Sequence, residues 1–223
     1  FASILIVVCG LIALERHFSG ILIILALGAV MMFLGGVQLR WFAIGAVLVG
    51  AFAAIYLSTM GYASARIAAW RDPMSDPSDT GYQILQSLYA IGSGGLMGLG
   101  FGHSRQKYLY LPEEHNDYIF PIVCEELGFV GAVAVILLFM LLIIRGYWIA
   151  MHARDRFGAL LAAGLTTHLA LQTFLNIGVV TNFLPATGIS LPFFSYGGTA
   201  LLIQLFEMGL ILAVSRQNDN KFL

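Results

Sequence analysis

The chain has 223 residues, of which 59% are hydrophobic and only 10% are charged, and its mean hydropathy is +0.87. Soluble domains carry about a quarter of charged residues to keep their surface hydrated, so lipid is expected to be the main solvent here. The formal net charge of −1 gives no basic surface, which argues against a nucleic-acid partner.

Long uncharged runs predict membrane-spanning helices, because about 20 apolar residues cross a hydrocarbon core of about 30 Å as a helix. In chain order these runs are 1–14 (a partial span), 18–37, 41–60, 118–144, 157–180 and 189–214. The predicted fold class is all-α, a polytopic transmembrane helix bundle with a long extracytoplasmic loop. Its parts are transmembrane helices at 1–60, the long loop at 61–117, and three transmembrane helices with a cytoplasmic tail at 118–223. We interpret the first run as a truncated span.

The distribution of basic residues predicts the orientation, because arginine and lysine in short connections favour the cytoplasmic side. If the long loop is outside, the short inner connections and the tail hold Arg40, Arg145, Arg154, Arg156, Arg216 and Lys221. The short connection at 182–188, which would be outside, has no charge. We therefore expect residues 61–117 to lie outside the cytoplasm.

The long loop has three parts of different composition. A turn-rich acidic patch at 72–79 is followed by an amphipathic segment at 82–90, which predicts a helix, and by a glycine-dense stretch at 92–102. Glycine at this density favours tight turns or a close approach of two backbones. Loops of this length are usually functional.

Ionisable residues gather between the glycine stretch and the span that begins at residue 118. Arg105 and Lys107 are cations, and Glu113, Glu114 and Asp117 are carboxylates. Asp117, like the neighbouring Asn116, is placed to cap the next helix. In a cavity, however, the helix dipole would keep Asp117 ionised, and it could remove a proton from a substrate hydroxyl. The spacing leaves both interpretations open.

Three further carboxylates lie inside apolar runs, where a charge costs a few kcal/mol and usually faces the bundle interior. For Glu125 and Glu126 we favour a structural ion pair or a hydrogen bond to a neighbouring helix. Glu207 belongs to the last run and could approach the inner membrane interface.

Prolines and glycines interrupt the last apolar runs between residues 182 and 198. Interrupted helices often mark a substrate site in membrane proteins, although small residues also serve helix packing. The candidate residues of this stretch are Ser195, Tyr196, Gly197 and Gly198.

Several of these stretches, in this order, resemble motifs of the SEDS family (shape, elongation, division and sporulation). They are 81–87, 90–96, 111–117, 125–129 and 191–198. Residues 102–107, Gly-His-Ser-Arg-Gln-Lys, are similar to the division and sporulation branch, the FtsW and SpoVE type, rather than to the elongation branch. The resemblance covers nearly the whole chain.

The resemblance implies a peptidoglycan glycosyltransferase that polymerises lipid II in the bacterial cytoplasmic membrane. It implies ten spanning helices and a class B penicillin-binding protein, the transpeptidase, as partner. It places the family's essential aspartate at Asp117, and a divalent cation, Mg or Mn, could assist at the pyrophosphate. The expected substrate-binding residues are Arg105, Lys107, Glu114, His115, Ser195, Tyr196, Gly197 and Gly198. A lipid II flippase and a non-catalytic scaffold for the transpeptidase are the alternatives.

Overall fold

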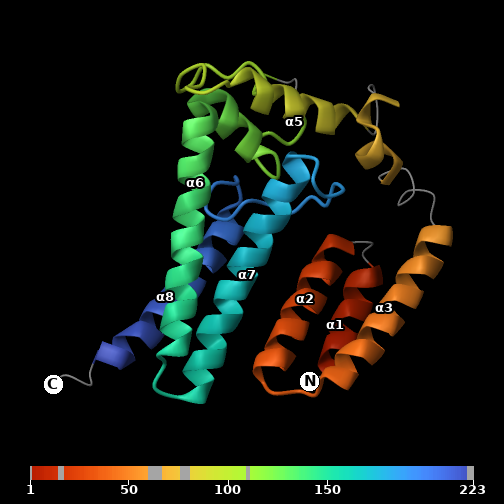
Figure 1. Ribbon diagram of the computed structural model, residues 1–223, viewed down its shortest axis with the longest axis vertical. Helices are drawn as coiled ribbons and strands as arrows, with labels where there is room; N and C mark the ends of the chain where they lie inside the picture. Colours follow the sequence, from red (N-terminus) through yellow and green to blue (C-terminus); the bar gives the residue numbers. More distant parts are fainter. Residues whose placement is uncertain (1, 15–17, 60–66, 76–80, 109–110, 220–223) are drawn as a thin grey trace.

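The computed structural model describes residues 2–14, 18–59, 67–75, 81–108 and 111–219. The regular elements in these ranges are all helical, which confirms the predicted all-α class (Figure 1). They are α1 (Ala2–Leu14), α2 (Phe18–Leu34), α3 (Leu39–Thr59), the 3-10 helix η1 (Pro73–Ser75), α5 (Tyr82–Ser93), α6 (Ile119–Met151), α7 (Arg156–Val180) and α8 (Gly198–Asp219).

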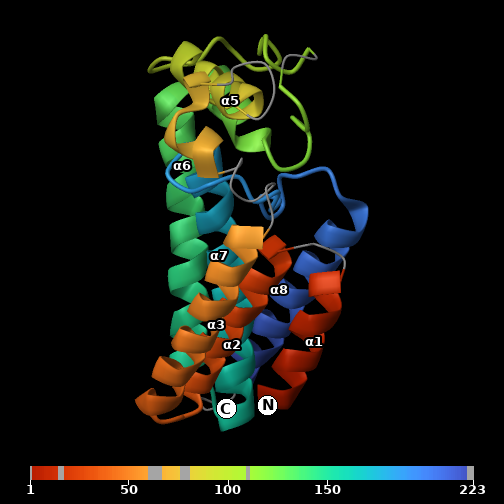
Figure 2. The same ribbon diagram turned by 90° about the vertical axis from the view of Figure 1, so that its right-hand side faces the viewer.

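Helix α7 is the centre of the bundle, because it packs against α6, α2 and α8, while α1 packs on α2. Helix α5 lies crosswise over one end of the bundle and packs on α6 (Figures 1 and 2). The connection between α7 and α8 lies at this same end (Figure 1). We call it the loop end. The long loop and the connection that contains residues 182–188 were predicted to lie on the same side of the membrane. In the structure both lie at the loop end (Figure 1).

Three helices in the described ranges are long and apolar enough to cross a membrane: Ile119–Met151, Arg156–Val180 and Gly198–Gln217. The other predicted spans correspond to shorter apolar helices, Ser3–Ala13, Ser19–Leu34 and Leu39–Ala51. The chain is thus a membrane protein built from apolar helices, as its composition predicted.

The prediction that the last span begins at residue 189 was wrong, because α8 begins at Gly198. Phe193 has a φ of +63°, a left-handed conformation that a right-handed helix cannot contain. Residues 189–197 instead form an irregular connection at the loop end, which places the predicted motif 195–198 at and just before the start of α8.

Helix α6 has 33 residues, and a straight helix of that length would be about 50 Å long, far more than the hydrocarbon core. A break at Gly128, with φ 67° and ψ −169°, divides it. Residues 129–151 are the part that runs along α7, whereas 119–127 form a short helix at the loop end (Figure 1). Glu125 and Glu126 precede this break and therefore belong to the short helix at the loop end.

Helix α5 confirms the amphipathic helix predicted at 82–90 and continues to Ser93. Its buried residues are Ile84, Leu85, Ser87 and Ala90. The hydroxyl of Ser87 donates a 2.6 Å hydrogen bond to the carbonyl of Val180, at the end of α7. This bond fastens α5 to the loop end of the bundle.

Candidate functional site

The glycine stretch lies against the break in α6, and the close backbone approach there is one of the two arrangements that its composition predicted. The amides of Leu99 and Gly100 donate to the carbonyls of Glu125 and Glu126 at 2.9 and 3.0 Å. β-carbons built on Gly94 and Gly98 would lie 2.0 and 2.1 Å from main-chain carbonyl oxygens of α6. Only glycine permits so close an approach of the two backbones.

Two buried carboxylates hold the turn that follows the glycines. Glu125 accepts from the hydroxyl of Ser104 and from the amides of Arg105 and Gln106 at 3.1 and 3.2 Å. Glu126 accepts from the amide of Ser104 and forms a 2.9 Å ion pair with Lys107. We call Ser104, Lys107, Glu125 and Glu126 the loop clasp.

The loop clasp confirms that Glu125 and Glu126 are structural, but their partners belong to the long loop and not to a neighbouring helix. The reason is the break at Gly128, which keeps both residues at the loop end instead of deeper in the span. Lys107 also donates to the carbonyl of Gly102, so its ammonium is engaged by the protein. The side chain of Arg105 is exposed, and no ion pair to it is found within the described residues.

Asp117 follows a tight turn that begins at Glu113, which has a left-handed φ of +56°. The amides of Asn116 and Tyr118 donate to the carbonyl of Glu113, and the side chain of Asn116 donates to its carboxylate at 2.6 Å. The prediction that Asn116 or Asp117 occupies the cap position of α6 was wrong, because the N-cap position is Tyr118, whose side chain makes no capping hydrogen bond. Asp117 is half-buried.

The connection between α7 and α8 passes close to Asp117. A β-carbon built on Gly188, whose φ is +68°, would lie 3.5 Å from Oδ2 of Asp117. The buried amide of Asn176 donates to the carbonyl of Asp117 at 2.6 Å and to that of Ile189 at 2.7 Å. Asn176 thereby joins the segment before α6 to the segment before α8.

A main-chain hydrogen bond also joins the motif at 195–198 to the segment that carries Asp117. The amide of Tyr196 donates to the carbonyl of His115 at 2.7 Å, whereas the tyrosine ring is exposed. The hydroxyl of Ser195 accepts from the amide of Leu191 at 2.8 Å, so it stabilises its own turn. Gly198 is the first residue of α8.

Glu114 and His115 complete the group around Asp117. The imidazole Nε2 of His115 lies 3.3 Å from Oε1 of Glu114, and the imidazole is largely exposed. The structure therefore brings Glu114, His115, Asp117 and the residues of 195–198 together at the loop end. Arg105 and Lys107 belong to a separate turn, which the loop clasp holds on α6.

The described residues do not assemble a metal site of their own, since no group of three histidine, cysteine, aspartate or glutamate side chains comes close enough there to hold an ion. The group around Asp117 instead offers a partly buried carboxylate, exposed polar side chains and two irregular backbone segments. A carboxylate in this position can accept a proton from a hydroxyl group that binds beside it.

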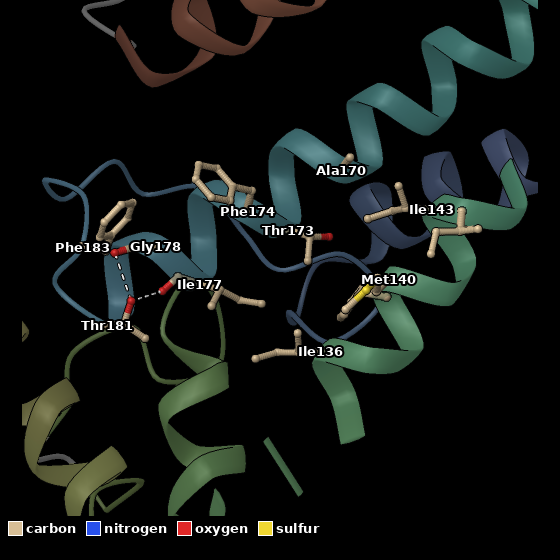
Figure 3. Close-up of a pocket in the computed structure, with 12 residues that line it drawn as sticks. Ile136, Met140, Ile143, Ala170, Thr173, Phe174, Ile177, Gly178, Thr181 and Phe183 are labelled. Carbon is tan, nitrogen blue, oxygen red and sulfur yellow. Dashed lines mark hydrogen bonds between the residues drawn. The ribbon is translucent and has the colours of Figure 1, made fainter. Parts of the chain in front are cut away.

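One cavity lies away from this group. It is a groove of about 370 Å³ between α6 and α7, lined almost entirely by apolar side chains (Figure 3). Its two threonine hydroxyls are engaged within α7, because Thr173 donates to the carbonyl of Leu169 and Thr181 to that of Ile177. The groove therefore suits hydrocarbon and offers no group for catalysis.

The sequence interpretation did not assign a role to Asn176 or Gly188. A buried asparagine in an apolar span is a signal, because an amide there needs hydrogen-bond partners. Its partners, however, are main-chain carbonyls of other segments, which the sequence alone does not identify. The long loop also contains Arg71, which is exposed, and Arg66, which lies outside the described residues.

The fold and this group define a class of multispanning helical membrane protein with a carboxylate-bearing site at the loop end. The family model described as cell cycle protein, of FtsW, RodA and SpoVE, matches residues 1–220. The chain therefore belongs to the FtsW/RodA/SpoVE family, which confirms the resemblance read from its motifs.

Named relatives are similar over most of the chain. Stage V sporulation protein E of Bacillus subtilis (strain 168) is 46% identical over 188 residues, which are 84% of this chain and 51% of that protein. The probable peptidoglycan glycosyltransferase FtsW of Geobacter metallireducens is 39% identical over 218 residues, which are 96% of this chain and 58% of that protein. The chain thus spans about half the length of the curated relatives it matches.

Solved structures share the fold. A chain of a peptidoglycan synthase complex, studied for the coordination of polymerization and crosslinking, has a TM-score of 0.79 and 29% identity, covering 97% of this chain and 61% of that one. The rod shape determining protein RodA of Thermus thermophilus has a TM-score of 0.64 and 29% identity, covering 97% of this chain and 55% of that one.

Proposed function

We propose that the protein containing this chain is a peptidoglycan glycosyltransferase that polymerises lipid II into glycan strands during cell division or sporulation. The observation that carries the proposal is the placement of Asp117. Its carboxylate lies beside Gly188, and its main chain is held by the buried amide of Asn176. Membership of a family with relatives named as peptidoglycan glycosyltransferases supports the same activity.

In the proposed reaction Asp117 removes the proton from the 4-hydroxyl of the acceptor sugar. The hydroxyl oxygen then forms a bond to the anomeric carbon of the donor, and the bond from that carbon to the pyrophosphate breaks. The electron pair leaves with the lipid pyrophosphate, and Asp117 afterwards releases its proton to water. A general base contributes roughly 10²- to 10⁴-fold in rate.

Charge develops on the leaving pyrophosphate, and a fixed cation would stabilise it. Arg105 is the better candidate, since its side chain is exposed while the ammonium of Lys107 is held by Glu126. A divalent cation, Mg or Mn, would supply the same stabilisation at the pyrophosphate, but the described side chains do not assemble a site that would hold it.

The proposal places the protein in the bacterial cytoplasmic membrane, with the loop end outside the cytoplasm. A class B penicillin-binding protein is the proposed partner, and the similar chain in a peptidoglycan synthase complex supports it. Membrane lipids surround the apolar faces of α6, α7 and α8.

The test is lipid II polymerisation by the full-length protein, with Asp117→Asn beside the wild type. Asparagine has nearly the same size as aspartate and keeps a side-chain oxygen that accepts hydrogen bonds, but it cannot act as a base. We expect a folded, membrane-inserted variant that makes almost no glycan. Near-normal glycan synthesis by that variant would contradict the proposal and favour the flippase or the scaffold, neither of which needs an ionised carboxylate at this position.

A further inference from the structure

A row of polar residues runs along α7 from Asn176 into the span. Asn176, Gln172 and His168 are spaced four residues apart, so they share one face of the helix. Asn176 is the residue that holds the carbonyl of Asp117. At 1.5 Å per residue, His168 lies about 12 Å along the helix from Asn176.

Two cavities meet at His168, on the side of α7 that faces α2. The first has a volume of about 290 Å³ and is lined by Gly20, Ile23, Ile24, His168, Gln172, Gly188, Ile189 and Ser190. The second has a volume of about 330 Å³ and is lined by Leu27, Met31, Leu160, Leu161, Gly164, Leu165, His168 and Glu207. We call the two together the α2–α7 crevice. Gly188, which lines the first cavity, is also the residue whose built β-carbon would lie 3.5 Å from Oδ2 of Asp117.

Two polar side chains of α7 line this crevice. Nδ1 of His168 lies 3.0 Å from Oε1 of the buried Glu207, so Glu207 holds the imidazole on the side of Nδ1. Oε1 of Gln172 is buried and has no hydrogen-bond partner among the described residues. A buried acceptor without a partner costs free energy unless a ligand or water satisfies it.

We propose that the α2–α7 crevice binds a sugar of the lipid-linked substrate, with Gln172 and His168 forming hydrogen bonds with its hydroxyl groups. Glu207 is a positioning residue that holds His168 through Nδ1. The inference rests on the proposed function for the identity of the substrate. It adds the residues that recognise the sugar and the face of α7 on which they lie.

The charge of the crevice favours this class of ligand over a phosphate. Among the described residues that line it, Glu207 is the only carboxylate, and none is an arginine or a lysine. An anionic pyrophosphate would therefore meet a carboxylate and no described cation, whereas a sugar hydroxyl can donate to the amide oxygen of Gln172. We therefore expect the pyrophosphate to bind at the exposed loop end, where Arg105 lies.

The experiment measures ligand binding by the full-length protein in the Asp117→Asn background, so that lipid II is not consumed. The probes are lipid II and undecaprenyl pyrophosphate, which has the same lipid and phosphates but no sugar. We expect Gln172→Ala and His168→Ala each to weaken lipid II binding about three- to tenfold, as for one lost hydrogen bond, without changing the affinity for undecaprenyl pyrophosphate. Thr173→Val is the matched control, because its hydroxyl bonds within α7 and faces the α6–α7 groove.

Two further variants separate recognition from helix packing. Ile24→Trp fills the first cavity from α2 without removing a polar group, and it should weaken lipid II binding alone. Glu207→Gln keeps an acceptor for Nδ1 of His168 and should retain the wild-type affinity, whereas Glu207→Leu should not. Thermal unfolding of each variant reports its folding.

Unchanged lipid II affinity in folded Gln172→Ala and Ile24→Trp, or equal losses for both probes, would overturn the inference. If Gln172→Ala does not fold, Ile24→Trp decides the question by itself. Failure of the proposed function has a different signature, because wild-type protein would then bind lipid II through the crevice without polymerising it.

Discussion

The side-chain amide of Asn176 donates hydrogen bonds to the main-chain carbonyls of both Asp117 and Ile189, at 2.6 and 2.7 Å. One buried side chain on α7 thus fixes the residue before α6 relative to the connection before α8. The position of Asp117 is thus maintained through its main chain. The placement of the proposed base therefore depends on a residue that does not take part in the chemistry.

Asn176→Ala should destabilise the protein and displace Asp117. The variant leaves two main-chain carbonyls without their donor, and an unsatisfied buried acceptor costs about 1–3 kcal/mol. We expect a lower midpoint of thermal unfolding and weaker lipid II polymerisation by the full-length protein. Thr173→Val, one turn away and also buried, is the control. It should change neither the midpoint of thermal unfolding nor the polymerisation of lipid II by much. Equal behaviour of the two variants would show that Asn176 has no special role.

Gly98→Ala should prevent the glycine stretch from packing on α6. A β-carbon there would lie 2.1 Å from the carbonyl oxygen of Glu126, and the φ of +79° is also unfavourable for alanine. We expect loss of folded protein, measured as the monodisperse fraction after purification. Gly92→Ala is the matched control, since Gly92 belongs to α5 and has open space around it. That substitution should be neutral or stabilising by up to about 1 kcal/mol.

Much of the fold could be predicted from the sequence because lipid imposes simple requirements. Apolar runs must become helices to satisfy their main-chain groups, so 157–180 predicted α7 to within a residue. The amphipathic pattern at 82–90 identified α5 in the same way. Dense glycine correctly predicted a close backbone approach, although it did not identify the partner segment.

The parts that could not be predicted depend on contacts between segments that are distant in sequence. The break at Gly128 falls inside an apolar run, so periodicity does not reveal it, and Glu125 and Glu126 were therefore placed too deep. The late start of α8 has a similar cause, since residues 189–197 are apolar enough to continue a helix. They remain irregular in the structure, where Asn176, His115 and Gln204 bond to their main chain.

The orientation of the bundle can be tested by cysteine labelling in intact cells. In a full-length protein without its native cysteines, Ser75→Cys should react with an impermeant thiol reagent from outside, because Ser75 is exposed in η1 of the long loop. Arg154→Cys, in the exposed turn between α6 and α7, should react only after the membrane is permeabilised. The reverse pattern would place Asp117 on the cytoplasmic side and exclude the proposed polymerisation outside.

The ion pair of the loop clasp should show energetic coupling. Lys107→Met leaves the partly buried carboxylate of Glu126 without its cation, and Glu126→Gln leaves the ammonium of Lys107 without its anion. Each single variant should lose roughly 1–3 kcal/mol of unfolding free energy, as for hydrogen bonds to charged groups. The double variant should lose less than the sum. Additive losses, measured by reversible unfolding in detergent, would show that the two side chains do not stabilise each other.

Arg105→Gln separates a role in binding from a role in folding. Its main-chain amide donates to Glu125 and is unaffected by the substitution, whereas its exposed guanidinium is lost. If the guanidinium stabilises the leaving pyrophosphate, polymerisation of lipid II should fall with no change in the unfolding midpoint. Lys107→Gln is the natural comparison, because it removes a cation two residues away that is held in the loop clasp, and it should lower the midpoint. Full polymerisation by a folded Arg105→Gln protein would show that Arg105 is a solvated loop charge, and the cation for the pyrophosphate would then have to come from elsewhere.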